Sequence, residues 1–76
     1  MHERLKNRLR EERARRNLTQ ADLAALAGVS RKTINTVENG IFIPSTVLAL
    51  RLARALDVPV ESIFQLPDQH PIAEDG

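Results

Sequence analysis

The stretch from residue 19 to residue 40, TQADLAALAGVSRKTINTVENG, limits the fold most, because it carries the boundary signals of two short helices. Thr19 is a preferred N-cap, and Asp22 stands at the third position, where it completes a capping box. Gly28 follows at the site where a left-handed residue ends a helix, and Ser30 is a second N-cap. The stretch therefore predicts two helices joined by a tight turn, at residues 20–27 and 31–38.

The second helix of this pair carries a polar face that packing does not require. Its inward residues are Ile34 and Val37, and the outward ones donate hydrogen bonds or carry positive charge. Helices with this spacing form a helix-turn-helix, whose second helix can lie in the major groove of DNA. An arginine fork can meet guanine O6 and N7 in two parallel bonds, and an asparagine can pair with adenine. The outward residues are Arg31, Lys32, Asn35, Thr36 and Asn39.

Apolar spacing and caps predict the remaining elements. Leu5 and Leu9 lie four apart on one face of a first helix, Ser45 can cap a fourth helix, and Ile63 and Phe64 can anchor a short fifth one. We therefore expect an all-α fold with five helices, at about residues 3–16, 20–27, 31–38, 46–56 and 60–65. We expect residues 1–66 to form one DNA-binding domain and residues 67–76, with three acids and no base, to form a flexible acidic tail.

Arg13 falls on the apolar stripe of the first helix, one turn beyond Leu9. A buried charge without a partner costs several kcal/mol, so Arg13 needs a carboxylate, and Glu38 is the candidate for a structural ion pair. The other arginines of this helix form either a solvated face or a phosphate-contacting one, and the sequence leaves both open. They are Arg4, Arg8, Arg10, Arg15 and Arg16.

The net charge of +1 hides an uneven distribution. Residues 1–18 hold seven Lys or Arg against three Glu, a balance of +4, whereas the last ten residues are acidic. A basic body of this kind is compatible with a phosphate-binding face.

The sequence offers no set of residues that could be assembled into a catalytic or metal-binding site. It has no cysteine, and its two histidines, His2 and His70, lie near its ends. We therefore expect neither an enzyme nor a metal or cofactor site. Because no apolar run approaches the roughly 20 residues of a membrane span, and charge follows Met1, we expect a cytoplasmic protein without a membrane partner.

The chain resembles the Cro/CI-type helix-turn-helix domains of the XRE family, which includes bacterial and phage repressors with the five-helix lambda-repressor-like fold. The motif that carries the resemblance is L-T-Q-x-x-L-A-x-x-A-G-V-S-x-x-T-I-x-x-x-E-N-G at residues 18–40. Pro44, Ser45 and the L-A-x-A-L-x-V-P run at residues 52–59 continue it, and the similarity covers about residues 5–66. Three residues depart from the family pattern: Glu12 replaces a usually apolar residue, and Asn17 and Asp57 replace common glycines.

The resemblance implies specific roles for individual residues. Gln20 is similar to the glutamine that packs over the DNA backbone and braces the recognition helix, and Arg13 and Glu38 match an internal ion pair of the family. The residues expected to contact bases are Arg31, Lys32, Asn35 and Thr36. Those expected to contact the DNA backbone are Thr19, Gln20, Ser30, Thr33 and Asn39.

These observations predict a sequence-specific transcriptional regulator that binds double-stranded DNA and represses by steric occlusion. One recognition helix contacts only a few base pairs, so we expect a homodimer on a palindromic operator with half-sites roughly 34 Å apart. Apolar residues of the fourth and fifth helices that have no evident partner in the chain are candidates for the dimer interface. They are Val47, Leu50, Val60, Phe64 and Leu66.

Two other interpretations stay open. The apolar run Ile41, Phe42 and Ile43, together with the acidic tail, fits an antitoxin-type module that binds a toxin or another protein partner and also binds its own operator. Alternatively, the tail begins a linker, and the chain is a fragment of a larger ligand-sensing regulator.

Overall fold

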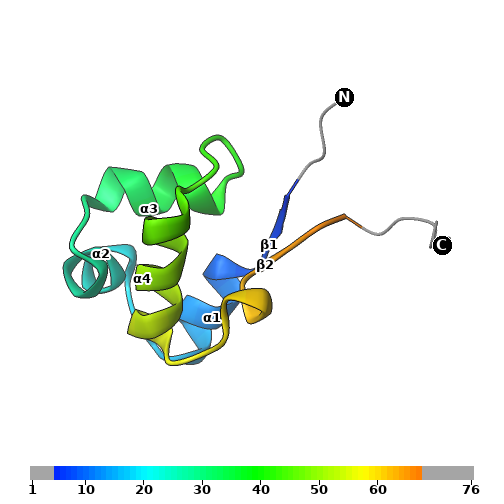
Figure 1. Cartoon of the computed structure of the whole chain (residues 1–76). Helices are drawn as coiled ribbons and strands as arrows, with labels where there is room; N and C mark the ends of the chain where they lie inside the picture. Colours follow the sequence, from blue (N-terminus) through cyan, green and yellow to red (C-terminus); the bar gives the residue numbers. More distant parts are fainter. Residues whose placement is uncertain (1–4, 68–76) are drawn as a thin grey trace, which may run out of the picture.

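Four helices and one small antiparallel sheet form the described part of the chain, residues 5–67 of this computed structural model (Figure 1). The predicted all-α fold is therefore confirmed as a mostly helical one, with four α-helices among the described residues instead of five. In chain order the elements are β1 (Lys6–Asn7), α1 (Leu9–Arg15), α2 (Gln20–Ala27), α3 (Arg31–Glu38), α4 (Thr46–Leu56), a 3-10 turn η1 (Val60–Ser62) and β2 (Phe64–Gln65).

The core lies where the inward faces of the helices meet, and aliphatic side chains fill it. α2 packs against both α3 and α4, and η1 and the residue after it close the core against α4. Burying each large aliphatic side chain contributes roughly 1.5–3 kcal/mol, so this cluster is the main source of stability. The fully buried large side chains are Leu9, Leu23, Ile34, Val37, Leu52, Leu56 and Ile63.

The capping signals of the sequence act as predicted. The Thr19 hydroxyl accepts from the Asp22 amide at 2.9 Å, and the Asp22 carboxylate accepts from the Thr19 amide at 2.9 Å, which completes the capping box. Ser30 and Ser45 cap α3 and α4 in the same way. Local side-chain chemistry thus sets the start of three helices, and α2, α3 and α4 have the predicted bounds.

Two helix ends use non-glycine residues in the left-handed conformation. Asn17 has φ 58°, and Asp57, the C-cap of α4, has φ 57°. Asn and Asp enter this region more readily than other side chains. α4 therefore ends where the sequence predicts, whereas α1 ends at Arg15, one residue earlier than predicted, with Arg16 as its C-cap.

The predicted first helix, residues 3–16, is wrong at its start. α1 begins at Leu9, and the residues before it form β1, which pairs with β2 in the register Lys6 with Gln65 and Asn7 with Phe64. Asn7 Oδ1 accepts from the Leu9 amide at 3.1 Å, and the Arg8 amide donates to the Ile63 carbonyl at 2.8 Å. Because backbone groups of this segment bond to the far end of the chain, they do not continue the helix.

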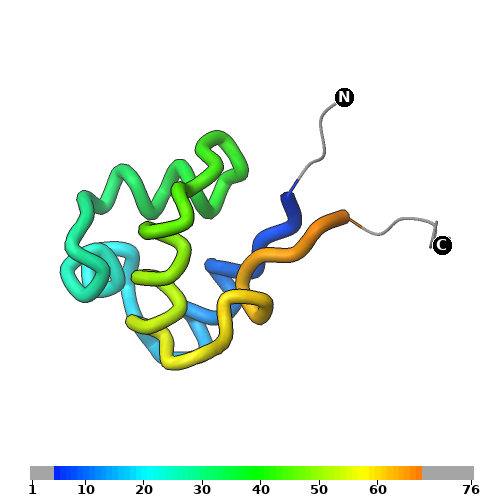
Figure 2. The backbone as a smooth tube through the Cα atoms, viewed as in Figure 1, coloured from blue at the N-terminus to red at the C-terminus, as the bar shows by residue number. Residues whose placement is uncertain are grey.

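The predicted fifth helix, residues 60–65, is wrong as well. A single 3-10 turn covers Val60–Ser62, and the chain then extends into β2. Figure 2 shows the two ends of the described chain running side by side as a result. Ile63 is still the buried anchor that the sequence predicts, since it is fully excluded from solvent.

Candidate nucleic-acid interface

The N-terminal half of α3 presents three exposed polar side chains of the predicted DNA face. Ser30 Oγ accepts from the Thr33 amide at 3.1 Å, which fixes the first turn of the helix. Arg31, Lys32 and Asn35 are all exposed, and with Gln20 of α2 they line one shallow hollow. The structure therefore brings four of the predicted DNA-contacting residues together, from the N-terminal parts of two helices.

The threonines of α3 lie deeper than the arginine and lysine. Thr33 and Thr36 are half-buried, and the Thr36 hydroxyl donates to the Thr33 carbonyl at 3.0 Å. The Thr33 and Ser30 hydroxyls lie 3.0 Å apart. Because these hydroxyl groups already have partners in the chain, the threonines present mainly their methyl groups and remaining lone pairs.

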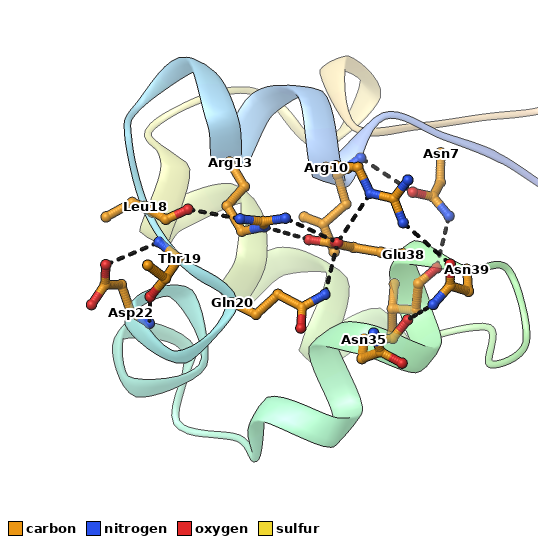
Figure 3. A network of polar contacts seen from close by, with 12 residues as sticks. Asn7, Arg10, Arg13, Leu18, Thr19, Gln20, Asp22, Asn35, Glu38 and Asn39 are labelled. Carbon is orange, nitrogen blue, oxygen red and sulfur yellow. Dashed lines mark hydrogen bonds and ion pairs between the residues drawn. The ribbon is translucent and has the colours of Figure 1, made fainter.

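The C-terminal end of α3 is held from α1. Arg10 Nη2 donates to Asn39 Oδ1 at 3.2 Å, while Asn39 Nδ2 donates to the Asn35 carbonyl at 2.9 Å (Figure 3). Asn39 is exposed, as a backbone-contacting residue must be, but its amide is oriented by these two bonds. Sequence reasoning left the role of Arg10 open, and the structure places it against the end of α3.

A single buried carboxylate joins α1, α2 and α3. Glu38 has a fully buried side chain, and its Oε2 accepts from Arg13 Nε at 2.6 Å. Its Oε1 accepts from Gln20 Nε2 at 3.1 Å, and Arg10 Nε lies 3.5 Å away (Figure 3). The expected partner of Arg13 is thus the residue it contacts, and Gln20 is oriented by the same carboxylate.

Burial and hydrogen bonding act on Glu38 in opposite directions. Burial opposes ionisation, but hydrogen bonds from Arg13 and Gln20 and the charge of Arg13 outweigh it, so the pKa of Glu38 lies below its ordinary value. The hydrogen bond that Arg13 donates to Glu38 also raises the pKa of Arg13. The pair is therefore ionised at neutral pH, and Arg13 Nη1 donates a further bond to the Leu18 carbonyl at 2.8 Å.

Asn7 connects this network to the small sheet. Its Nδ2 donates to the Val37 carbonyl at 2.8 Å, in the last turn of α3, while its backbone belongs to β1 (Figure 3). Sequence reasoning missed this contact. Asparagine is a preferred helix cap, and its place two residues before Leu9 was the available signal.

The remaining predicted site residues divide into exposed and packed ones. Thr19 is exposed and its hydroxyl is occupied by the capping box of α2. Val60 and Phe64 are half-buried and pack on the core of their own chain. The prediction that they have no partner within the chain is therefore wrong. The three other interface candidates are exposed: Val47 by 61%, Leu50 by 55% and Leu66 by 67%.

Two features are absent within residues 5–67. No three acidic, histidine or cysteine side chains gather into a group that could hold a metal ion. None of the described helices has the length and hydropathy to cross a membrane. The predicted tail lies outside the described residues except for Pro67, as do His2 and His70.

Comparison with known proteins identifies this arrangement. The helix-turn-helix family HTH_3 matches residues 9–63. The uncharacterized HTH-type transcriptional regulator MJ0272 of Methanocaldococcus jannaschii is 47% identical over 64 residues, which cover 84% of this chain and 97% of that protein. The uncharacterized HTH-type transcriptional regulator YgzD of Bacillus subtilis is 35% identical over 66 residues, or 87% of this chain and all of that one.

A solved structure agrees with these sequence relatives. The restriction-modification controller protein C.AhdI from Aeromonas hydrophila superposes with a TM-score of 0.68 and 42% identity. The match covers 70% of this chain and 80% of that one. With a family match over most of the described residues and relatives of nearly the same length, the chain belongs to the XRE-type helix-turn-helix family.

Proposed function

We propose that the chain binds double-stranded DNA in a sequence-specific way and regulates transcription, with α3 as its recognition helix. The observation that carries the proposal is the exposed row of Arg31, Lys32 and Asn35 on a helix whose opposite face is fixed in the core. The names of the relatives, HTH-type transcriptional regulators, support the same role.

In this proposal the side chains divide by the part of DNA they reach. Arg31 and Lys32 donate to guanine acceptors, Asn35 pairs with adenine, and Thr36 offers a methyl group and a hydroxyl oxygen to a base edge. A second set contacts phosphates and fixes the register without reading sequence. This set consists of Thr19, Gln20, Ser30, Thr33 and Asn39.

The proposal includes a twofold dimer on a palindromic operator. Val47 and Leu50 are exposed on α4, and Leu50 lines a crevice together with Leu5, Val60 and Phe64. This exposed apolar surface supports an isologous contact, in which the same patch of both copies meets across the axis. Two recognition helices about one DNA turn apart then contact enough base pairs to select an operator, and repression follows from occupation of that site.

The base-reading role of Arg31 gives the most direct test. We expect Arg31→Ala to reduce the ratio of operator to random-DNA affinity by about tenfold or more, because a bidentate arginine discriminates by roughly 1–3 kcal/mol. The operator is first selected from a random pool of duplexes, and both affinities are then measured by fluorescence anisotropy at one fixed salt concentration.

Arg54→Ala is the matched control for this test. It removes the same charge from an exposed arginine near the C-terminal end of α4, which does not line the hollow that Arg31 shares with Gln20, Lys32 and Asn35. We expect it to leave the specificity ratio unchanged. If Arg31→Ala kept the wild-type ratio, Arg31 would not be a base-reading residue, and if wild-type protein selected no sequence from the pool, the proposed function would be wrong.

A further inference from the structure

Side chains from β1 and α1 donate hydrogen bonds to the C-terminal end of α3. The donors are spaced three residues apart, and the acceptors are three consecutive residues. The pairs are Asn7 with Val37, Arg10 with Asn39, and Arg13 with Glu38 (Figure 3). Of the three donors, Asn7 is the neutral one, and it precedes α1. The end of α3 is therefore held in part from the small terminal sheet.

The Asn7 side chain has one favourable orientation. Its Nδ2 donates to the Val37 carbonyl at 2.8 Å, and its Oδ1 accepts from the Leu9 amide at 3.1 Å, at the start of α1. A flipped amide would place oxygen against the Val37 carbonyl and nitrogen against the Leu9 amide, so both bonds would be lost. The Val37 side chain is 1% exposed, which fixes this part of α3 to the core. Asn7 thus sets one defined distance between β1 and the end of α3.

The position of Asn7 depends on the pairing of the two chain ends. Asn7 lies opposite Phe64 in the register of β1 and β2. The Arg8 amide donates to the carbonyl of Ile63, which is fully buried, at 2.8 Å. Strands of two residues contribute few hydrogen bonds, so this sheet can open locally while the helices stay folded. When it opens, Asn7 loses the backbone position from which it contacts Val37.

We propose that Asn7 is a positioning residue that couples the pairing of the chain ends to the orientation of α3, so that the closed sheet supports specific DNA binding. The inference rests on the proposed function and deepens it, because Asn7 acts through Val37 on its neighbours Thr36 and Asn39. Reading base edges requires side chains held to about 0.5 Å, whereas the electrostatic attraction of random DNA does not. Loss of the contact therefore lowers operator affinity more than random-DNA affinity.

Asn7→Ser tests the contact itself. Serine keeps an acceptor at the start of α1 but is too short to reach the Val37 carbonyl. We expect the ratio of operator to random-DNA affinity to fall by about fivefold, the worth of one hydrogen bond. The operator is selected from a random pool with the wild-type chain, and both affinities are measured by fluorescence anisotropy at one salt concentration.

Gln65→Pro tests the dependence on the sheet while Asn7 stays in place. The Arg8 amide bonds to Ile63, and hydrogen-bonded pairs alternate along an antiparallel sheet. Lys6 and Gln65 are therefore the next hydrogen-bonded pair, and a proline at position 65 has no amide donor for it. We expect the same fall in the ratio. The double variant should lose no more than either single variant, because both substitutions break the same coupling.

Two control variants separate positioning from a general loss of stability. Ser45→Ala removes the bond that caps α4, at 3.1 Å to the Leu48 amide, and should lower stability without changing the ratio. Leu66→Pro adds a proline one residue beyond β2, where the alternation leaves no ladder bond to lose. Circular dichroism checks the fold of every variant, and Asn7→Ser and Gln65→Pro each test the proposal if the other does not fold.

The outcomes separate this inference from the proposed function. Failure of the wild-type chain to select any operator refutes the proposed function itself. An unchanged ratio in Asn7→Ser, with an operator selected, overturns the positioning role alone. An equal fall in Ser45→Ala assigns the effect to stability, and additive losses in the double variant show that Asn7 and the sheet act separately. Either of these two results overturns the coupling.

Discussion

Replacing Glu12 by leucine should stabilise this fold, although Glu12 lies in a helix and carries a charge. Among the described residues, Glu12 is the charged residue that is buried as a whole, with 6% of its surface exposed. Its Oε1 has no hydrogen-bond partner. Its Oε2 lies 3.8 Å from Arg15 Nη1, on a side chain that is itself 70% exposed. The carboxylate has therefore lost most of its hydration and has gained only one weak, solvated partner.

The expected size of the effect follows from these contacts. A buried acceptor without a partner costs about 1–3 kcal/mol, while an exposed ion pair contributes about 0–1 kcal/mol. The carboxylate also gains about 0.3–1 kcal/mol from its place in the first turn of α1, near the positive end of the helix dipole. Glu and Leu have similar helix propensities, and leucine adds buried apolar surface. We expect Glu12→Leu to be about 1–2 kcal/mol more stable, with a midpoint about 4–8 °C higher per kcal/mol.

Urea and thermal unfolding followed by circular dichroism measure this difference, at one protein concentration because association shifts apparent stability. The matched control is Glu11→Leu, an exposed neighbour in the same turn, which has no burial cost to relieve and should lose only its helix-dipole contribution, about 0.3–1 kcal/mol. If Glu12→Leu were no more stable than wild type, Glu12 would have a compensating role that its contacts do not reveal.

Two further predictions concern the ion pair and the dimer. Because the folded pKa of Glu38 is lowered, its ionisation stabilises the fold above the ordinary glutamate pKa of about 4.3, and this contribution is lost as pH falls through the lower folded value. Glu38→Gln should therefore lose less stability than wild type between neutral pH and that acidic range in urea titrations, and parallel losses would contradict this. Leu50→Asp should shift the proposed dimer toward monomer in sedimentation equilibrium, while Leu26→Asp, exposed on α2, should not; equal behaviour of the two variants would exclude the α4 face.

Local signals explain why the middle of the chain was predicted well. Caps at Thr19, Ser30 and Ser45 act within three residues of themselves, so α2, α3 and α4 can be bounded from sequence alone. The same holds for the left-handed Asn17 and Asp57, where one residue type at one position decides the helix end.

The two ends of the chain were predicted wrongly because their structure depends on each other. Lys6 and Asn7 pair with Phe64 and Gln65, and strands of two residues carry no alternation that a pattern search could detect. The leucine spacing from Leu5 to Leu9 suits a helix, but pairing with a distant segment overrides it. The contact between Asn7 and Val37 was missed for the same reason, since it joins residues 30 apart in sequence.

In the candidate site, too, the features that depend on local sequence were predicted and those that depend on distant residues were not. Helical periodicity predicts the outward residues of α3. The pairing of Arg13 with Glu38 can be predicted because a charge on an apolar stripe needs a partner. The orientation of α3 does not follow from sequence, because it depends on donors from two other helices. Gln20 and Arg10 both contact Glu38, and neither contact can be predicted from the residue type.

A comparison of Glu38 with Glu12 shows under which conditions a buried carboxylate stabilises the arrangement of the helices. Packing through Ile34 and Val37 holds α3 by a narrow apolar face, which by itself leaves rotation about the helix axis weakly constrained. Glu38 receives donors from α1 and α2, so a small rotation of α3 breaks several charge-assisted bonds together. Base reading requires side chains held to about 0.5 Å, and we infer that this rotational constraint is what the buried ion pair contributes. Glu12 has no comparable set of partners, which is why leucine should replace it with a gain in stability and no change in how α3 is presented.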